Sequence, residues 1–125
     1  MYSLTSANLY YLYQGFVRMN LGIDGLFKII RSEMKDLSPV SGDIFLFFGK
    51  NRQSVKILRW DGDGFLLYYK RLEGGSFELP TFNPNTGNYE ISYQVLSFIL
   101  NGVSLKSVRL RKRFRIYVIY CILAI

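Results

Sequence analysis

The stretch VKILRWDGDGFLLYYKRLEGGSFELP, residues 55–80, decides the fold that this sequence predicts. Two apolar runs, at residues 55–60 and 65–72, flank the tetrapeptide Asp61-Gly62-Asp63-Gly64. Asp and Gly tolerate the positive backbone angles of a tight reversal, so this pattern predicts a β-hairpin. A second glycine turn follows, and the short run at residues 76–80 ends in a proline, which favours a third strand. The middle of the chain is therefore expected to form an antiparallel meander.

Further elements are predicted on both sides of this meander by the spacing of apolar residues and by turn residues. Upstream, they are a strand at residues 8–15, an amphipathic helix at 22–35, and an apolar strand at 44–48 that suits burial on both faces. Downstream, they are a short strand at 89–92 and a helix at 93–100 that Gly102 ends. The expected fold class is α+β, an antiparallel β-meander of four to five strands with one N-terminal amphipathic helix packed on it and a short C-terminal helix.

The composition excludes several classes of protein. Half of the 125 residues are hydrophobic and 17% are aromatic, which excludes disorder for most of the chain and favours a packed domain. Cys121 is the single cysteine and histidine is absent, so an intramolecular disulfide is excluded and the usual zinc ligand sets are missing. No metal or other cofactor is expected. Because no N-terminal signal pattern is present, the expected compartment is the cytoplasm.

The net charge of +7 is concentrated near the C-terminus. Residues 1–90 hold ten Lys or Arg against nine Asp or Glu, whereas residues 91–125 hold six basic residues and no acidic one. The six are Lys106, Arg109, Arg111, Lys112, Arg113 and Arg115. Such a density favours either contact with DNA phosphates, through release of counterions, or a solvated tail.

The expected domain organisation is a single α+β domain at residues 1–115, which includes the basic segment at 106–115, followed by an apolar extension at 116–125. The extension reads IYVIYCILAI and has ten residues without charge, whereas a membrane-spanning helix needs ~20. No membrane span is therefore expected. A β-branched run of this length favours a strand or a buried terminal element, with a position at a membrane surface as the alternative.

A second group of candidate DNA contacts lies in and around the predicted sheet. It consists of Lys50, Arg52, Lys56, Arg59, Lys70 and Arg71. In extended strands Lys56 and Arg59 point to opposite faces, and so do Lys70 and Arg71, so the six cannot form one patch. A part of the group that includes the loop residues Lys50 and Arg52 would line one edge and contact phosphates without reading sequence. The alternative is cross-strand pairing with Asp61, Glu73 or Glu78.

The two carboxylates of the hairpin turn, Asp61 and Asp63, permit the hypothesis of a metal-dependent nuclease. A calcium loop needs further oxygen ligands at fixed later positions, and the apolar residues that follow the turn supply none, so turn chemistry is the favoured interpretation. An acidic triad formed in space by Asp24, Asp43 and Glu73 is a further alternative. Because histidine, the commonest general base, is absent, no catalytic residue is predicted.

The aromatic residues of the hairpin allow two interpretations. Trp60 is most simply a core residue or an aromatic that flanks the turn. An exposed Trp60, with Tyr68 and Tyr69 beside basic residues, would instead stack the bases of a single strand.

A series of motifs runs through the chain. In the meander they are Lys56, Leu58, Trp60-Asp61-Gly62, Gly64, Lys70-Arg71-Leu72-Glu73, Gly75, Phe77 and Pro80. Upstream are Gly22-Ile23-Asp24-Gly25-Leu26 and Gly42-Asp43-Ile44-Phe45-Leu46-Phe47, and downstream is a leucine-rich helix at residues 96–102. At this spacing the series resembles the Orf2-like (TnpB) accessory proteins of insertion sequences of the sixty-six family, over roughly residues 10–115.

The resemblance implies structural roles for a set of motif residues. They are Gly22, Asp24, Gly25, Trp60, Asp61, Gly62, Gly64 and Pro80. The chain departs from the family at two places. Where the family has Asp, Met, Arg and Lys before the first glycine, this chain has Arg18, Met19, Asn20 and Leu21, and Leu79 stands in place of a tryptophan.

The resemblance also implies a function. It implies a non-catalytic accessory protein for DNA transposition, carried by a mobile element that encodes a separate transposase. The partners to expect are the DNA of the element ends, the transposase, or both. The alternatives are a protein bridging factor without direct DNA contact and the metal-dependent nuclease that would use Asp61 and Asp63.

Overall fold

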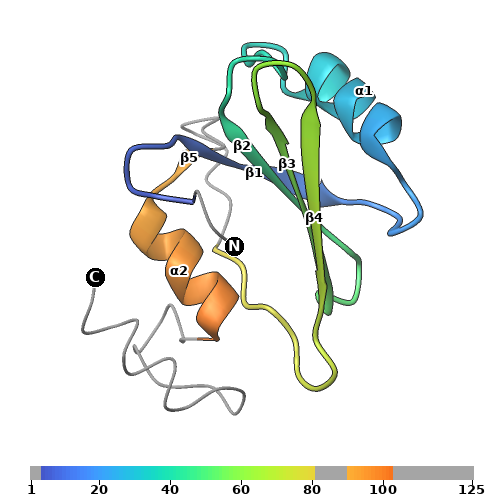
Figure 1. Cartoon of the computed structure of the whole chain (residues 1–125). Coiled ribbons are helices and arrows are strands. Elements are labelled where there is room, and N and C mark those ends of the chain that lie inside the picture. The colour runs from blue at the N-terminus through green and yellow to red at the C-terminus, as the bar shows by residue number, and fades with distance from the viewer. Residues whose placement is uncertain (1–3, 81–89, 103–125) are drawn as a thin grey trace.

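The computed structural model describes residues 4–80 and 90–102 of the chain, and in them a five-stranded sheet lies between two helices (Figure 1). The elements are β1 (Tyr10–Phe16), α1 (Ile23–Glu33), β2 (Ile44–Phe48), β3 (Ser54–Trp60), β4 (Phe65–Arg71), β5 (Glu90–Ile91) and α2 (Tyr93–Asn101). The strand order is β4-β3-β2-β1-β5. The α+β class is confirmed, with an N-terminal helix and a short C-terminal helix.

The sheet is mixed, and this corrects the expectation of a purely antiparallel sheet. β2, β3 and β4 form the antiparallel meander that the sequence predicts, and β5 is antiparallel to β1. β1, however, is parallel to β2, with Tyr10 beside Ile44 and Phe16 beside Phe48. The reason is the intervening helix, because a crossover through α1 returns the chain to the same end of the sheet before β2 begins.

The run at residues 76–80 is not a strand, which corrects a second expectation. It passes the end of the sheet instead of pairing with β4 (Figure 1). The Phe77 backbone N–H donates to the Arg52 carbonyl at 2.7 Å, and the Phe77 ring meets the Phe48 ring edge-on at 5.4 Å. Burial of Phe77 beneath the sheet therefore replaces the pairing that a third meander strand would have made.

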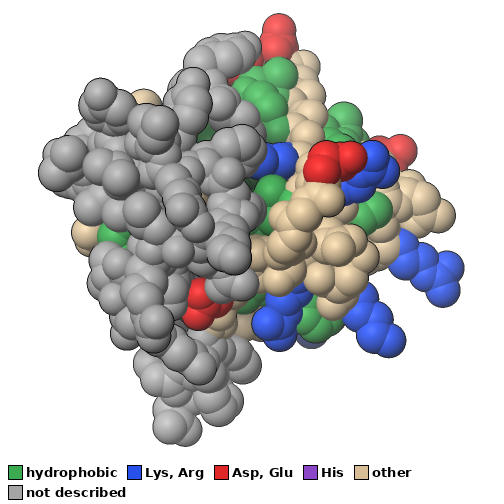
Figure 2. Space-filling model, turned by 90° about the horizontal axis from the view of Figure 1, so that it is seen from below, with side chains coloured by type: hydrophobic (Ala, Val, Ile, Leu, Met, Phe, Trp, Pro, Cys, Tyr) green, Lys and Arg blue, Asp and Glu red, His purple; other side chains and the backbone are tan. Residues whose placement is uncertain are grey.

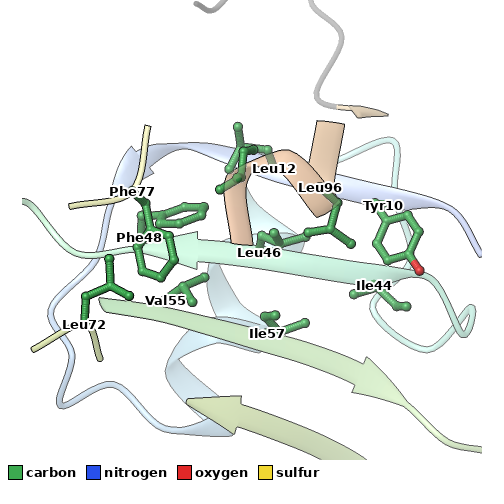
Figure 3. Packing of buried hydrophobic residues seen from close by; sticks show 11 residues of the cluster. Tyr10, Leu12, Ile44, Leu46, Phe48, Val55, Ile57, Leu72, Phe77 and Leu96 are labelled. Carbon is green, nitrogen blue, oxygen red and sulfur yellow. The ribbon is translucent and has the colours of Figure 1, made fainter. Parts of the chain in front are cut away.

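The two faces of the sheet hold two separate hydrophobic clusters. On one face Leu26, Ile30 and Met34 of the α1 segment pack against Phe45 and Phe47. Figure 3 shows the other face, where Leu46 and Phe48 lie in a cluster that includes Leu96 of α2. All five residues of β2 are buried, which confirms that this strand is covered on both sides.

The hairpin between β3 and β4 has the turn that its sequence predicts. The Asp61 backbone N–H donates to the Gly64 carbonyl at 2.7 Å, and Gly62 has a φ of 82°. Trp60 meets Phe65 edge-on at 4.9 Å and is only partly exposed, so it flanks the turn as a packed aromatic.

The two helices lie where the sequence predicts them, although α1 ends at Glu33 and not at residue 35. Asp24 lies in the first turn of α1, where a carboxylate favours the positive end of the helix dipole. Ser92 caps α2 by accepting a hydrogen bond from the Val95 backbone N–H at 3.1 Å, and Gly102 ends it in the left-handed region. Among residues 4–80 and 90–102, neither helix is long and apolar enough to cross a bilayer.

Candidate nucleic-acid interface

One end of the sheet gathers three of the predicted cations. Lys50 and Arg52 lie in the loop between β2 and β3, and Arg71 is paired with Ser54, the first residue of β3. All three are exposed. Figure 2 looks onto this end and shows Lys and Arg side chains projecting from it. The prediction that part of this group shares one edge therefore has a geometric basis.

Arg52 sits in a backbone conformation that side chains rarely adopt. Its φ is 59°, and among the described residues no other non-glycine residue has a positive φ. Three hydrogen bonds hold the loop: Arg52 N–H to the Gly49 carbonyl at 2.9 Å, Gly49 N–H to the Ser54 carbonyl at 3.1 Å, and Phe77 N–H to the Arg52 carbonyl at 2.7 Å. The Arg52 guanidinium lies 5.8 Å from the centre of the Phe16 ring. The loop thus fixes this arginine at the cost of local strain.

An open groove of about 900 Å³ lies beside Arg52. Its walls are the end of β1 with the residues that follow it, and the loop after β2. The lining residues are Phe16, Val17, Arg18, Met19, Asn20, Gly49, Lys50 and Asn51. The Val17 N–H donates to the Phe48 carbonyl at 3.0 Å, which joins the two walls. Arg18 and Lys50 are exposed, and none of the lining residues is acidic.

The other three predicted cations of the sheet are not part of this exposed group. Lys56 is buried, and its ammonium donates to the Leu21 carbonyl at 2.6 Å and lies 5.5 Å from the centre of the Tyr69 ring. Lys70 lines a small pocket with residues of α2, on the face opposite to Lys56. Lys56 is therefore withdrawn from the candidate DNA contacts, because its charge is occupied inside the protein.

Arg59 is placed near the buried end of β1. It is partly buried, and it is paired with Ile44 at the start of β2, away from the groove. Burial raises the pKa of Tyr10 to about 12, the nearby Tyr93 adds to this, and the charge of Arg59 opposes it. Arg59 thus faces the α2 side of the sheet at the end opposite to Lys50 and Arg52.

One of the predicted cations, Arg71, forms an ion pair within the protein. The Arg71 Nε lies 3.1 Å from a carboxylate oxygen of Glu73, with side chains that are 62% and 80% exposed. An exposed pair of this kind contributes little, at about 0–1 kcal/mol. Arg71 therefore stays accessible to an anionic ligand that competes with Glu73.

The acidic residues do not come together. Asp61 and Asp63 lie in the hairpin turn and are exposed. Asp43 precedes β2, where it accepts a hydrogen bond from the Ser41 hydroxyl at 2.8 Å. Glu73 follows β4, whose last residue Arg71 pairs with Ser54 at the opposite end of the sheet. Within residues 4–80 and 90–102, no three His, Cys, Asp or Glu side chains are placed to hold a metal ion. The nuclease hypothesis has no carboxylate cluster to rest on in this part of the chain.

Two residues of the groove escape sequence reasoning. Phe16 lies just after the strand predicted at residues 8–15, although it is the last residue of β1, and Arg18 entered only as a departure from the family pattern. Their place beside the Gly49 loop depends on the parallel pairing of β1 with β2, which brings Phe16 next to Phe48. Recognition of a β-α-β unit in residues 8–48 was the signal that would have found them.

Several sequence predictions concern residues outside the described ranges. They are the basic residues Lys106, Arg109, Arg111, Lys112, Arg113 and Arg115, and the apolar extension at 116–125 with Cys121. The hypothesised stacking surface, by contrast, is described, and it is divided. Tyr69 is 52% exposed, whereas Tyr68 packs against the cluster on the opposite face of the sheet.

Comparison with known proteins supports the resemblance seen in the motifs. The model of the family described as IS66 Orf2 like protein matches residues 8–110. The uncharacterized protein y4hO of Sinorhizobium fredii (strain NBRC 101917 / NGR234) is 33% identical over 89 residues, which cover 71% of this chain and 75% of that protein. The uncharacterized protein y4jC of the same strain is 32% identical over 82 residues, which cover 66% and 68%. No solved structure matches the chain significantly.

Proposed function

Because the chain belongs to the IS66 Orf2-like protein family, we propose that it is a non-catalytic accessory protein of transposition that binds the DNA of its element through the basic end of the sheet. Association with an insertion sequence follows from the family. Direct binding to DNA, the lack of a catalytic centre of its own and action in the cytoplasm are parts of the proposal.

The observation that carries the proposal is the groove between β1 and the loop after β2. Arg18 and Lys50 line it, Arg52 stands at its side, and its lining contains no carboxylate to compete for them. Exposed cations grouped on one face release counterions from a phosphate backbone, which gives affinity without reading sequence. Any preference of this protein for the DNA sequence of the element ends would then come from the transposase, which would bring those ends to it.

The basic residues at 106–115 remain a prediction of further phosphate contacts. Six cations in ten positions would add to the affinity that the groove supplies. Neutralising Arg109, Arg111, Lys112, Arg113 and Arg115 together is expected to weaken binding to duplex DNA. The two groups of cations can be tested separately, because they lie in different parts of the chain.

The test is a mobility-shift titration of the full chain on the terminal repeats of its element, over a series of salt concentrations. The variant Arg18→Gln/Lys50→Gln/Arg52→Gln removes three charges at the groove. Its matched control, Lys28→Gln/Arg31→Gln/Lys35→Gln, removes three exposed charges on and just after α1. The groove variant should flatten the plot of log affinity against log salt by roughly one per residue, while the control should leave the slope near that of the wild type.

Two results would contradict the proposal. The first is equal behaviour of the two triple variants, which would show that net charge and not the groove determines binding. The second is the absence of any shift at low salt by the full chain. Co-purification with the transposase that persists in both variants, without any DNA shift, would select the bridging function instead.

A further inference from the structure

The groove has an apolar floor that phosphate binding does not require. Val17 is 8% exposed, and the Met19 side chain lies 3.5 Å from the position that a side-chain carbon on Gly49 would occupy. Phe16 is 45% exposed at the rim, one of few large apolar side chains on the described surface to be so. Phe16 lies beside three cations and a partly buried apolar floor, and this combination suits a ligand that is both anionic and apolar.

Arg52 and Phe16 supply the geometry for such a ligand. The guanidinium lies 5.8 Å from the ring centre, and the loop's hydrogen bonds hold the arginine backbone in a strained conformation. Aromatic rings and guanidinium planes are the surfaces on which nucleic-acid bases stack in proteins that bind single strands. The ring is thus presented at the solvent boundary together with the charge that a neighbouring phosphate needs.

We infer that this groove binds an unpaired nucleotide of single-stranded DNA, with the base against Phe16 and Met19 and the flanking phosphates on Arg18 and Lys50. This rests on the proposed function and narrows it, since a duplex presents phosphates but keeps the faces of its bases stacked inside. The groove is wide and open at about 900 Å³, which admits a base without displacing the loop. Element DNA with frayed or unpaired ends is then the preferred ligand.

The test compares three fluorescently labelled ligands by anisotropy with the full chain. They are a dT oligonucleotide, an abasic oligonucleotide with the same number of phosphates, and a hairpin duplex. Stacking on one base is expected to make dT bind roughly 5- to 150-fold more tightly than the abasic strand. Phe16→Ala and Phe16→Leu should lower the affinity for dT toward that for the abasic strand and leave the abasic affinity unchanged. Lys50→Gln should weaken both by the same factor.

A matched aromatic control is Tyr69→Ala, because Tyr69 is exposed on β4 and does not line the groove. It should leave the preference for dT intact. Phe16→Leu keeps an apolar side chain at the rim, so it separates loss of stacking from loss of folding, which melting curves monitor. Equal affinity for dT and the abasic strand, or an unchanged preference in Phe16→Leu, would overturn the inference. Either result leaves the proposed function standing if the duplex is still bound through the groove cations, whereas failure to bind any of the three ligands removes both.

Discussion

The ammonium of Lys56 donates a 2.6 Å hydrogen bond to the carbonyl of Leu21, and this bond ties β3 to the segment that ends two residues before α1 begins. Leu21 directly follows the groove wall formed by residues 16–20. A buried lysine thereby positions the surface that carries Arg18, although its own charge does not reach the groove. Lys56, which belongs to the motif series of the meander, therefore has a structural role.

Lys56→Met should destabilise the protein by about 1–3 kcal/mol, because the partly buried Leu21 carbonyl loses a charged donor while the apolar volume of the buried side chain is kept. Urea unfolding of the variant measures this change. Lys28→Met, on the exposed side of α1, is the control and should stay within about 0.5 kcal/mol of the wild type. A more stable Lys56→Met protein would show instead that burying the ammonium costs more than its hydrogen bond returns.

Two substitutions of Arg52 distinguish the effect of backbone strain on stability from the effect of the guanidinium on DNA binding. At a φ of 59° a glycine suffers no clash with a β-carbon, whereas alanine retains it, so Arg52→Gly should be more stable than Arg52→Ala by roughly 1 kcal/mol. Thermal or urea unfolding compares the two variants. Both lack the guanidinium, so both should lose DNA affinity to the same extent. Equal stability of the two variants would mean that the loop relaxes out of the left-handed region.

Gly62 tests the turn that defines the hairpin. It has a φ of 82° and open space around its α-carbon, so Gly62→Ala adds a backbone penalty of about 1–2 kcal/mol without a steric clash with neighbours. Gly64→Ala is the matched control, since Gly64 also has open space but no positive φ. Unfolding of the two variants side by side checks the difference. If the alanine at residue 64 proved the more costly, the turn would have a different conformation.

The raised pKa of Tyr10 should make the free energy of unfolding depend on pH in the alkaline range. It is 1% exposed, its hydroxyl donates to the Thr5 carbonyl at 2.7 Å, and burial raises its pKa from 10.0 to about 12. Because the fold favours the neutral phenol, this contribution is complete below pH 10 and is lost as the pH rises through 12. The free energy of unfolding of the wild type should therefore approach that of Tyr10→Phe by about 2 kcal/mol over this interval.

The comparison that decides this prediction is between the two curves of unfolding free energy against pH. Titration of groups that do not interact with Tyr10 affects both proteins alike and cancels in the difference, and the nearby Tyr93 is the tyrosine that does not cancel. Curves that stay parallel between pH 10 and 12 would show that the Tyr10 hydroxyl is not desolvated in the folded protein.

Local patterns in the sequence predicted the local parts of the fold. The Asp-Gly turn at residues 61–64, the helix with Asp24 in its first turn and the stop at Gly102 each depend on neighbours within a few positions. The parallel pairing of Tyr10 with Ile44 depends on a crossover, and nothing in either strand specifies its direction. The run at residues 76–80 failed as a strand because the burial of Phe77 outweighed a β-prone composition.

The candidate site was only partly predictable for the same reason. Lys50 and Arg52 lie in one loop, so their proximity could be read from the chain. Alternation along β3 predicted the face of the sheet on which Lys56 lies. It did not predict the hydrogen bond of Lys56 to the Leu21 carbonyl, because the two residues are 35 positions apart in the sequence. Phe16 and Arg18 joined the site only through the pairing of β1 with β2. Non-local contacts thus determined what sequence patterns left open.

The position of β1 inside the sheet sets an order of events during synthesis. Its neighbours are β2 on one side and β5 on the other, and Tyr10 pairs with Ile91. A ribosome adding about 5–20 residues per second needs roughly 4–16 seconds to deliver the second partner after the first strand has left the exit tunnel. Until then one flank of β1 has no strand to bond, and the nascent chain is expected to depend on chaperones over that interval.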